Sequence, residues 1–393
     1  MVEKTGSFVE KSAFAVSEKE AYWYQRRVFL QKAGYRLRPK FHPDFVGPIG
    51  DQIAQHPKKH IMDADRIYDG QQVMLKCISK RKFPHEVEIG QLFSTDAMAK
   101  NPRNRCIPIL DTLDDPYDGD KQIIVMPRLI RFDEPLFDTV GEVVDCFRQL
   151  AEGLQFMHDN FVAHRDLSLL NIMQDPSRLF PRGFHPVNYC LNPTNDGLAY
   201  CITRTECWPQ YHIIDFGLSR RYDPAHGPPH ETVVPGASEV TPPEYASGQC
   251  NPFPADIYCL GDLFKRHFRA GGHVPLAFLA PIVDAMTQKD PAMRPTIGEV
   301  IARFNDVCCR LGSWDLRKPG QMLDWPAWID QRLRQLKNIF KGRRPLSSQC
   351  LLSLSSPKRT SSSSSTALNS RMRTFYTRTP KSAGKPRSLA KLR

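Results

Sequence analysis

Two short stretches of the chain carry the polar residues that a phosphoryl transfer requires. In the first, Asp166 is followed five positions later by Asn171, and in the second Asp215 ends an apolar run. Phosphoryl transfer needs oxygen ligands that hold metal ions on the phosphates, and an acceptor for the proton of the attacking hydroxyl. Asp166 suits the acceptor role, and Asn171 and Asp215 suit the metal. Together, in this order, the two stretches predict a phosphotransferase site.

Lys76 is a further candidate. A lysine on a strand is usually a solvated edge residue, but Lys76 lies within the apolar run 73–78. A charge in such surroundings is costly unless it is paired. We therefore expect Lys76 to be a paired, functional lysine.

In type and order, these residues resemble the eukaryotic protein kinase family. The resemblance rests on six motifs between about residues 60 and 305: V-M-L-K at 73–76, H-R-D-L-S-L-L-N at 164–171, D-F-G at 215–217, T-P-P-E at 241–244, D-I-Y-C-L-G at 256–261 and D-P-A-M-R-P at 290–295. In this order, the six motifs resemble the family's V-A-I-K strand, its catalytic loop, its D-F-G and A-P-E motifs, the start of its long buried helix, and its late D-P-x-x-R-P segment. The wider background is similar to kinase-like proteins expanded in filamentous fungi.

The resemblance implies a site for ATP and Mg²⁺. Lys76 would hold the α- and β-phosphates, Asn171 and Asp215 the metal, and His164 would pack beneath Phe216. The implied catalytic residues are Asp166, Lys76, Glu86 and Arg165, and the implied nucleotide-binding residues are Lys76, Met126, Leu129, Asn171, Asp215 and Gly217. Met126 would gate the adenine pocket, with 127–129 as the hinge, and Pro127 has no N–H to donate there.

Two acids compete to pair with Lys76. Glu86 shares a helical face with Ile89 and Phe93, whereas Glu88 shares one with Leu92. The place of Glu86 in H-E-V-E-I resembles the family better, so Glu86 is the preferred partner and Glu88 the alternative.

Four features depart from the family pattern. No G-x-G-x-x-G precedes Lys76, and Ser168 and Ala237 stand where the family has a lysine and a threonine that touch the catalytic aspartate. Asn171 and Asp215 lie 44 positions apart, which predicts an insertion beside the active site at about 174–210. About six residues, 270–275, separate the buried helix from the next one, where the family usually has a substrate-docking helix.

Arg165 often receives an activation-loop phosphate in the family. Candidate sites for such a phosphate are Tyr222, Thr232, Ser238 and Thr241.

Three functions compete. The preferred one is an ATP-dependent protein kinase acting on Ser or Thr rather than Tyr, with no protein substrate identified by the sequence. The second is a pseudokinase that serves as an interaction scaffold. The third, a small-molecule phosphotransferase of the aminoglycoside or choline kinase kind, would lack the arginine of H-R-D, the P-P-E segment and the motif at 290–295, all of which are present.

The elements that position these residues change in character along the chain. Strand-like runs at 73–78, 107–113 and 122–129 precede the helical spacing of 143–157. This order predicts an α+β fold with a small β-rich N-lobe, a larger helical C-lobe and a disordered C-terminal tail. The predicted segments are an extension with one helix (1–45), the N-lobe (46–130), the C-lobe (131–312), an amphipathic helix (313–345) and a basic, Ser/Thr-rich disordered tail (346–393).

The extension helix opens with a capping box at Ser17 and Glu20 and stops at Gly34. We expect it to pack on the folded body rather than to serve as an interaction helix. We also expect the helix within 313–345 to pack on the body, and the alternative is that it docks on a membrane or on a partner protein.

The net charge of +12 is concentrated at one end. Residues 341–393 hold 13 of the 54 Lys and Arg and none of the 42 Asp and Glu, so the rest of the chain is close to neutral. The body of the chain is therefore not expected to bind nucleic acid. If the chain binds an import receptor, an anionic lipid or nucleic acid, we expect the tail to make that contact. No apolar run reaches the length of a membrane span, no signal peptide is visible, and the eleven cysteines are scattered. We therefore expect an intracellular protein, cytoplasmic or nuclear or both.

Overall fold

The computed structural model describes residues 18–42, 58–234, 240–269 and 276–318. All of them belong to one compact unit. Several expectations fall outside the described residues: the cap at Ser17, the altered position Ala237, the connection 270–275, and nearly all of 313–345 with the tail 346–393. Within the described part, no helix is both long enough and apolar enough to cross a membrane.

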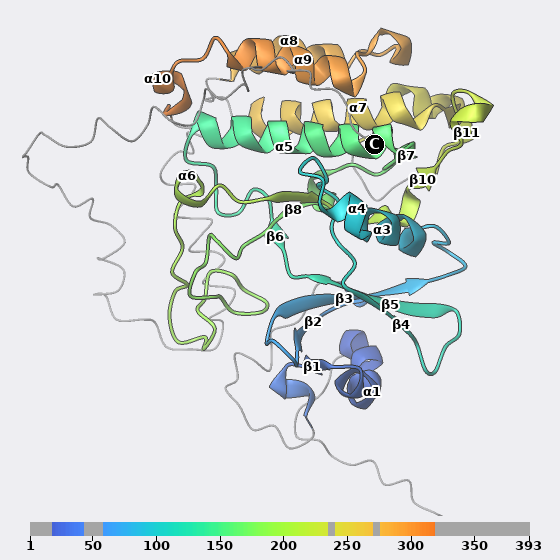
Figure 1. Ribbon diagram of the computed structural model, residues 1–393, viewed down its shortest axis with the longest axis vertical. Helices are drawn as coiled ribbons and strands as arrows, with labels where there is room; N and C mark the ends of the chain where they lie inside the picture. Colours follow the sequence, from blue (N-terminus) through green and yellow to red (C-terminus); the bar gives the residue numbers. More distant parts are fainter. Residues whose placement is uncertain (1–17, 43–57, 235–239, 270–275, 319–393) are drawn as a thin grey trace, which may run out of the picture. The chain divides into compact units, whose positions relative to one another are not determined.

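The N-lobe is built on a five-stranded sheet whose order is β1-β2-β3-β5-β4, with every neighbouring pair antiparallel (Figure 1). The strands are β1 (Tyr35–Leu37), β2 (Ile61–Arg66), β3 (Gln72–Ser79), β4 (Asp111–Asp114) and β5 (Lys121–Pro127). The predicted extension 1–45 therefore contains a strand of the N-lobe sheet, because β1 pairs with the end of β2. The family's glycine-rich connection would join these two strands, and Gly47 and Gly50 lie in the undescribed part of that connection.

Alternation along the strands gives the sheet two different faces. Val73 and Leu75 of β3 pack, with Ile123 and Val125 of β5, in a cluster that contains Trp23 and Leu30. The last two residues lie on α1 (Glu18–Lys32), so this helix covers one face of the sheet, as expected of a helix that packs on the body. The intervening residues Met74 and Lys76 face the other side, toward the cleft. The chain leaves α1 through Gly34, whose φ of 95° disfavours any side chain.

Polar contacts fix α1 against the sheet. The Arg26 Nε donates to Asp115 Oδ2 over 2.7 Å, and both side chains are nearly inaccessible to solvent. The indole N–H of Trp23 donates to the carbonyl oxygen of Lys59 over 3.0 Å. The cleft face carries α3 (Glu86–Ser94) and α4 (Asp96–Ala99), which together fill the single helical stretch predicted from His85 to Ala99.

The C-lobe is mainly helical, and most of its helices lie together above the sheet in Figure 1. They are α5 (Val140–Asp159), α7 (Pro252–Phe264) continuing as a π-helical turn (Lys265–Arg269), α8 (Ala280–Met286), α9 (Ile297–Cys308) and α10 (Ser313–Leu316). The stretch 256–261 was predicted to start the long buried helix, but α7 begins earlier, at Pro252, because Asn251 caps it and Pro252 occupies its first turn.

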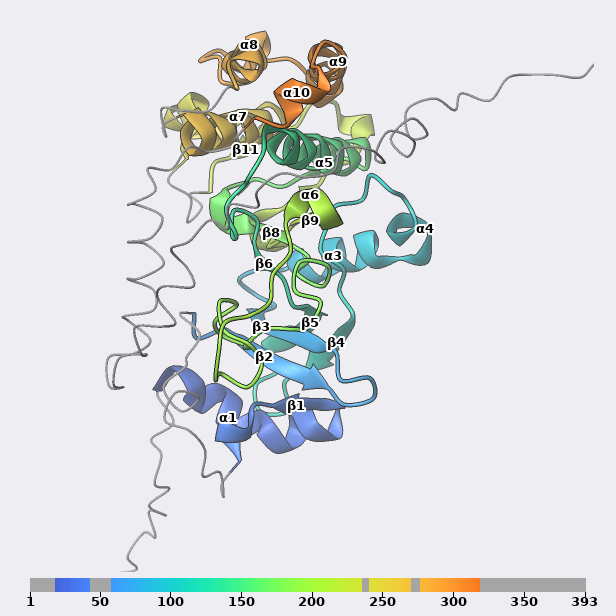
Figure 2. The ribbon, with the colours of Figure 1, turned by 90° about the vertical axis from the view of Figure 1, so that its left-hand side faces the viewer.

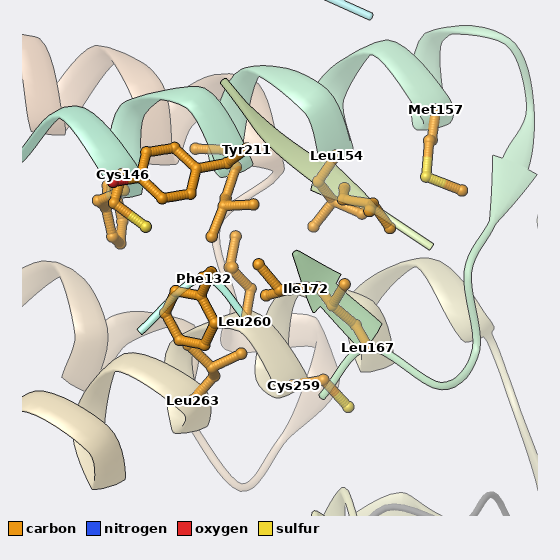
Figure 3. Close-up of a cluster of buried hydrophobic side chains, with 14 of the residues drawn as sticks. Phe132, Cys146, Leu154, Met157, Leu167, Ile172, Tyr211, Cys259, Leu260 and Leu263 are labelled. Atoms are coloured by element: carbon orange, nitrogen blue, oxygen red, sulfur yellow. The ribbon is translucent and has the colours of Figure 1, made fainter. Parts of the chain in front are cut away.

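Short strands join the helices to the site. They are β6 (Ile130–Arg131), β7 (Val162–Ala163), β8 (Ile172–Gln174), β9 (Tyr211–Ile213), β10 (Arg220–Arg221), β11 (Glu231–Thr232) and β12 (Gln249–Cys250). Figure 3 shows part of the core that surrounds these strands, and Leu154 and Met157 of α5, Ile172 of β8 and Leu260 of α7 belong to it. This core fixes the strand ends from which the predicted site residues project. The small β-rich lobe and the larger helical lobe expected from the sequence are thus both present.

The predicted insertion lies between β8 and β9 and contains α6 (Arg204–Cys207). It has a small apolar core of its own, which includes Leu179, Phe180 and Phe184. Figures 1 and 2 both show it running from α6 toward β2 and β3 of the N-lobe sheet.

Candidate functional site

The centre of the site is an ionic cluster around Lys76. The Lys76 ammonium donates to Glu86 Oε1 and, over 2.8 Å, to Asp215 Oδ1. Glu86 lies on α3 and is 2% exposed. Glu88 lies on the outside of the same helix, where its carboxylate faces His85 at 3.6 Å and is 72% exposed. The structure thus brings Lys76 together with the preferred partner and separates it from the alternative.

Burial and charge set the protonation of this cluster. Burial favours the neutral amine form of Lys76, but the carboxylates of Glu86 and Asp215 together outweigh it and raise the pKa of Lys76 above its usual value. Burial likewise acts to raise the pKa of Asp215, but Lys76 outweighs it, and the pKa is lowered. For Glu86, burial prevails and raises the pKa of the carboxyl group. Lys76 is therefore charged and Asp215 ionised at neutral pH.

Asp166 and Asn171 lie beside each other in the loop that precedes β8. The Asn171 amide nitrogen donates to the backbone oxygen of Asp166 over 2.8 Å and to its Oδ2 over 3.0 Å. Because the nitrogen is used in this way, the amide oxygen is the atom that Asn171 can offer to a cation. Amide and carboxylate oxygens are the ligands that Mg²⁺ prefers. The pair formed by Asn171 and ionised Asp215, both lining the same cavity, therefore fits this metal.

The backbone that carries Asp166 is held by Asp256 of α7. Its carboxylate, 1% exposed, accepts 2.7 Å hydrogen bonds from the backbone N–H groups of both His164 and Arg165. Arg165 has a φ of 69°, a conformation that is costly for a residue with a side chain. The two hydrogen bonds offset this strain and fix the direction in which Asp166 leaves the loop.

The predicted packing of His164 is also found. Its ring is 6.1 Å from that of Phe216, and its Nε2 is 3.0 Å from the carbonyl oxygen of Ile214. Its Nδ1 accepts from the backbone N–H of Asp166 over 3.2 Å, so the structure fits a neutral ring with the proton on Nε2. His164 is thus a structural residue that joins the two motifs.

A cavity of about 340 Å³ opens between the lobes. At one end it is lined by Lys76, Glu86, Asn171 and Asp215, and its walls are mostly apolar. Met126 and Leu129 line it, as expected of a gate and a hinge residue. Pro127 lies between them and lacks an N–H, whereas Leu129 retains one.

Three predicted site residues, Gly217, Arg165 and Asp166, are not among the residues that line this cavity, although Asp166 contacts Asn171, which does. Gly217 lies behind Asp215 and Glu86. Its N–H donates to Asp215 Oδ1 over 3.3 Å, and a Cβ there would come within about 3.2–3.3 Å of the Phe83 ring and the Glu86 carboxylate. Gly217 therefore positions Asp215 and Glu86 by permitting their close approach.

Arg165 is the second of these residues, and it points into the activation segment. One of its nitrogens is 3.4 Å from Glu231 Oε2, and Arg220 approaches the other oxygen of the same carboxylate to 3.3 Å. The Tyr222 hydroxyl donates to Glu231 over 3.1 Å. A carboxylate thus occupies the place beside Arg165 at which the sequence led us to expect a phosphate.

The late motifs meet as the resemblance implies. Arg294 donates to both oxygens of Glu244 over 2.7 Å, and the arginine side chain is fully buried. Such a bidentate pair fixes the end of the activation segment to the helical lobe.

The protein kinase domain family matches residues 68–269, just over half of the chain. The chain belongs to the protein kinase family. Myosin light chain kinase 3 of Homo sapiens is 30% identical over 129 residues, and a light-sensor protein kinase of Ceratodon purpureus is 26% identical over 145 residues. These alignments cover 33% and 36% of this chain, and 12% and 9% of the relatives. The chain thus spans a small part of the length of the curated relatives it matches.

Among solved structures, the twitchin kinase region from C. elegans matches with a TM-score of 0.44 and 16% identity. The match covers 71% of this chain and 48% of that one.

Several residues of the site are not recognisable from the sequence. Pro186, Val187 and Tyr189 of the insertion line the cavity, as does Lys58 before β2. The 44-residue spacing places the insertion beside the site but does not say which of its residues face inward. Glu231 carries no local signal, because its two arginines are 66 and 11 positions away in the sequence.

Proposed function

We propose that the chain is an ATP-dependent protein kinase that transfers the γ-phosphoryl group to a protein hydroxyl, that of Ser or Thr rather than Tyr. The observation that carries the proposal is the position of Lys76, held between Glu86 and Asp215 at the polar end of a cavity between the lobes. Three charges gathered from β3, α3 and the segment after β9 are costly to bury together, and a phosphate ligand is the reason to keep them.

In this proposal each residue has one task. Lys76 binds phosphate oxygens, and Glu86 holds its ammonium in place. Asp166 orients the substrate hydroxyl and accepts its proton. Asn171 and Asp215 would hold Mg²⁺, which supplies positive charge to the phosphate oxygens when bound.

Met126 and Leu129 would face the adenine. A backbone hydrogen bond to the base has to come from a residue other than Pro127, and Leu129 is the proposed donor.

The second candidate is a pseudokinase scaffold, and one observation favours it. Ser168, where the family has a lysine, is 6% exposed and lies two residues beyond Asp166. It brings no charge to the transferring group, so the positive potential beside that group is weaker and transfer should be slower. This feature lowers the expected rate but leaves Lys76, Asp166 and the metal-binding pair in place.

The test is phosphate transfer from Mg-ATP to a generic protein substrate or to the chain itself, for wild type and Asp166→Ala. The proposal expects wild type to exceed the variant by at least about a hundredfold, the lower range for a positioned general base. Equal rates would contradict it. A thermal shift with Mg-ATP would then separate a nucleotide-binding scaffold from one with an empty cleft.

The charge distribution of the sequence is the basis for proposing partners and a location. The basic segment 341–393 is proposed to contact an import receptor, an anionic lipid or nucleic acid, and the protein is proposed to act in the cytoplasm, the nucleus or both.

A further inference from the structure

The insertion 175–210 is anchored in the large lobe by its α6 end. Arg204, 2% exposed, donates to the carbonyl oxygens of Leu136 over 2.9 Å and Phe132 over 2.7 Å. Thr205 donates from its backbone N–H and from its hydroxyl to the Glu142 carboxylate of α5 over 2.9 and 2.7 Å. These contacts fix one end of the insertion to the start of α5.

The remainder of the insertion is held by its own packing. The rings of Phe180 and Phe184 lie 5.0 Å apart, and that of Tyr189 is 6.2 Å from Phe180. The turn that follows is stabilised by His185, whose Nδ1 accepts from the backbone N–H of Val187 over 3.2 Å. The insertion is therefore a folded element whose tip has a defined position.

That tip lies against the hinge. The Arg128 guanidinium stacks 4.3 Å over the Phe184 ring and donates to the carbonyl oxygen of His185 over 3.4 Å. It also donates to Gln72 at the start of β3 over 2.9 Å. Burial lowers the pKa of Arg128 to about 10, consistent with a guanidinium covered on this side.

The tip also reaches the N-lobe sheet. A second cavity, of about 220 Å³, is lined by Pro186 and Pro193 on one side and by Arg38 and Ala64 on the other. An element that starts in the large lobe thus contacts the hinge and the small lobe.

Three side chains of the insertion line the large cavity: Pro186, Val187 and Tyr189. None carries a charge, so they suit a base or a sugar rather than a phosphate. Their distance from Lys76 also suits a base or a sugar. On the sheet, Lys76 pairs with Ile124, which lies four residues before Arg128. At about 3.3 Å per residue, the tip meets the hinge about 13 Å from the lysine level.

We propose that the tip of the insertion, residues 186–189, is a fixed wall of the nucleotide site that packs against the base and ribose of the bound adenine nucleotide. The inference rests on the proposed function and adds binding residues that the protein kinase resemblance does not supply. It also offers a source of nucleotide affinity in a chain whose sequence has no glycine-rich loop before Lys76.

The test is the Kd of Mg-ATP and of adenosine, measured by calorimetry on the full chain. The variants are the double substitution Val187→Ala with Tyr189→Ala, and the control Tyr200→Ala, an exposed tyrosine of the same insertion outside the cavity lining. We expect the double variant to raise both Kd values by about five- to tenfold, the effect of losing a few tens of Å² of apolar contact. The control should stay within about twofold of wild type, since surface changes have small effects.

The outcomes separate the two proposals. If wild type binds no Mg-ATP, the proposed function fails. If wild type binds and the double variant binds equally well, only the wall is refuted. Should the double variant not fold, Val187→Trp adds volume at the tip instead and is expected to raise the Kd of Mg-ATP more than tenfold, and an unchanged Kd there would also refute the wall.

Discussion

Replacing Glu231 should release the activation segment without touching the cavity. In the structure its carboxylate neutralises Arg165 and Arg220 and accepts from the Tyr222 hydroxyl. Glu231→Ala removes all three contacts and leaves Arg165, whose side chain is 9% exposed, facing no acid at this position. The activation segment should become less ordered, and the loop that carries Asp166 should be held less firmly in its present geometry.

The magnitude follows from the distances. Unit charges separated by the 3.4 Å between Arg165 and Glu231 attract by about 5 kcal/mol at an effective dielectric constant near 20. Desolvation and the 25% exposure of Glu231 offset much of this. Arg220 is 47% exposed, so its share is small. We expect a net loss of about 1.5–3 kcal/mol, the usual range for hydrogen bonds to a charged group. That loss is roughly a ten- to hundredfold shift in the equilibrium between the ordered and released segment.

Two measurements report this shift: hydrogen exchange in peptides covering 218–234, and kcat/KM for phosphate transfer. Glu231→Ala should speed exchange and lower kcat/KM by about tenfold or more, and Glu231→Gln, which can still accept from Tyr222, should fall between it and wild type. Wild type should keep its rate after phosphatase treatment, because the carboxylate already satisfies Arg165. Asp223→Asn is the matched control, since this acid of the same segment is 58% exposed. If Glu231→Ala behaves like the control in both assays, the carboxylate does not order the segment.

Three further predictions follow from the site and its supports. Glu86→Gln should lower transfer by about tenfold or more while Glu88→Gln leaves it unchanged, because of these two acids only Glu86 contacts Lys76. Equal rates in the two variants would show that Glu86 has no role in the site. Ser168→Lys should raise kcat roughly tenfold by returning a positive charge to the transferring group, and a fall in kcat would contradict this. Arg26→Ala should lower the free energy of unfolding by about 3 kcal/mol, read from denaturant melts, because it removes the positive charge beside the buried Asp115 and leaves it the neutral donors Tyr22 and Tyr117. Burial acts to raise the pKa of Asp115, but the hydrogen bonds from Arg26, Tyr22 and the Tyr117 N–H together outweigh it and lower the pKa. The stabilisation is therefore complete above about pH 4 and is lost as pH falls through the lowered pKa, and a loss that did not change with pH would refute the assignment.

Much of the catalytic centre was predictable because its chemistry and its fold use the same local patterns. The apolar run around Lys76 forces a strand, and the alternation of that strand directs Lys76 to the cleft. Helical periodicity left both Glu86 and Glu88 as candidates, and the resemblance of H-E-V-E-I to the family favoured Glu86, which the structure places inward while Glu88 lies in solvent. In such cases a few neighbouring residues decide both the element and the direction of the side chain.

The rest depends on contacts between distant segments. The sequence directs Arg165 to the activation segment but does not identify Glu231 as the group that it meets there, and it does not show that Gly217 acts as a spacer between Asp215 and Glu86. Residues 35–37, which lie in the predicted extension, form a strand only by pairing with β2, and no local pattern predicts that pairing. Packing against the hinge decides which residues of the insertion face inward, and no local sequence pattern predicts that packing.

The central claim is that this cleft transfers phosphate. Its most direct test is mass spectrometry of a generic protein substrate and of the chain itself after incubation with Mg-ATP, for wild type, Lys76→Ala and Asp166→Ala, with melting curves to confirm that each is folded. The account predicts phosphate on Ser or Thr with wild type, a loss of at least about a hundredfold in rate in both variants, and retained Mg-ATP binding in Asp166→Ala. Folded wild type that transfers no more phosphate than Asp166→Ala would contradict it.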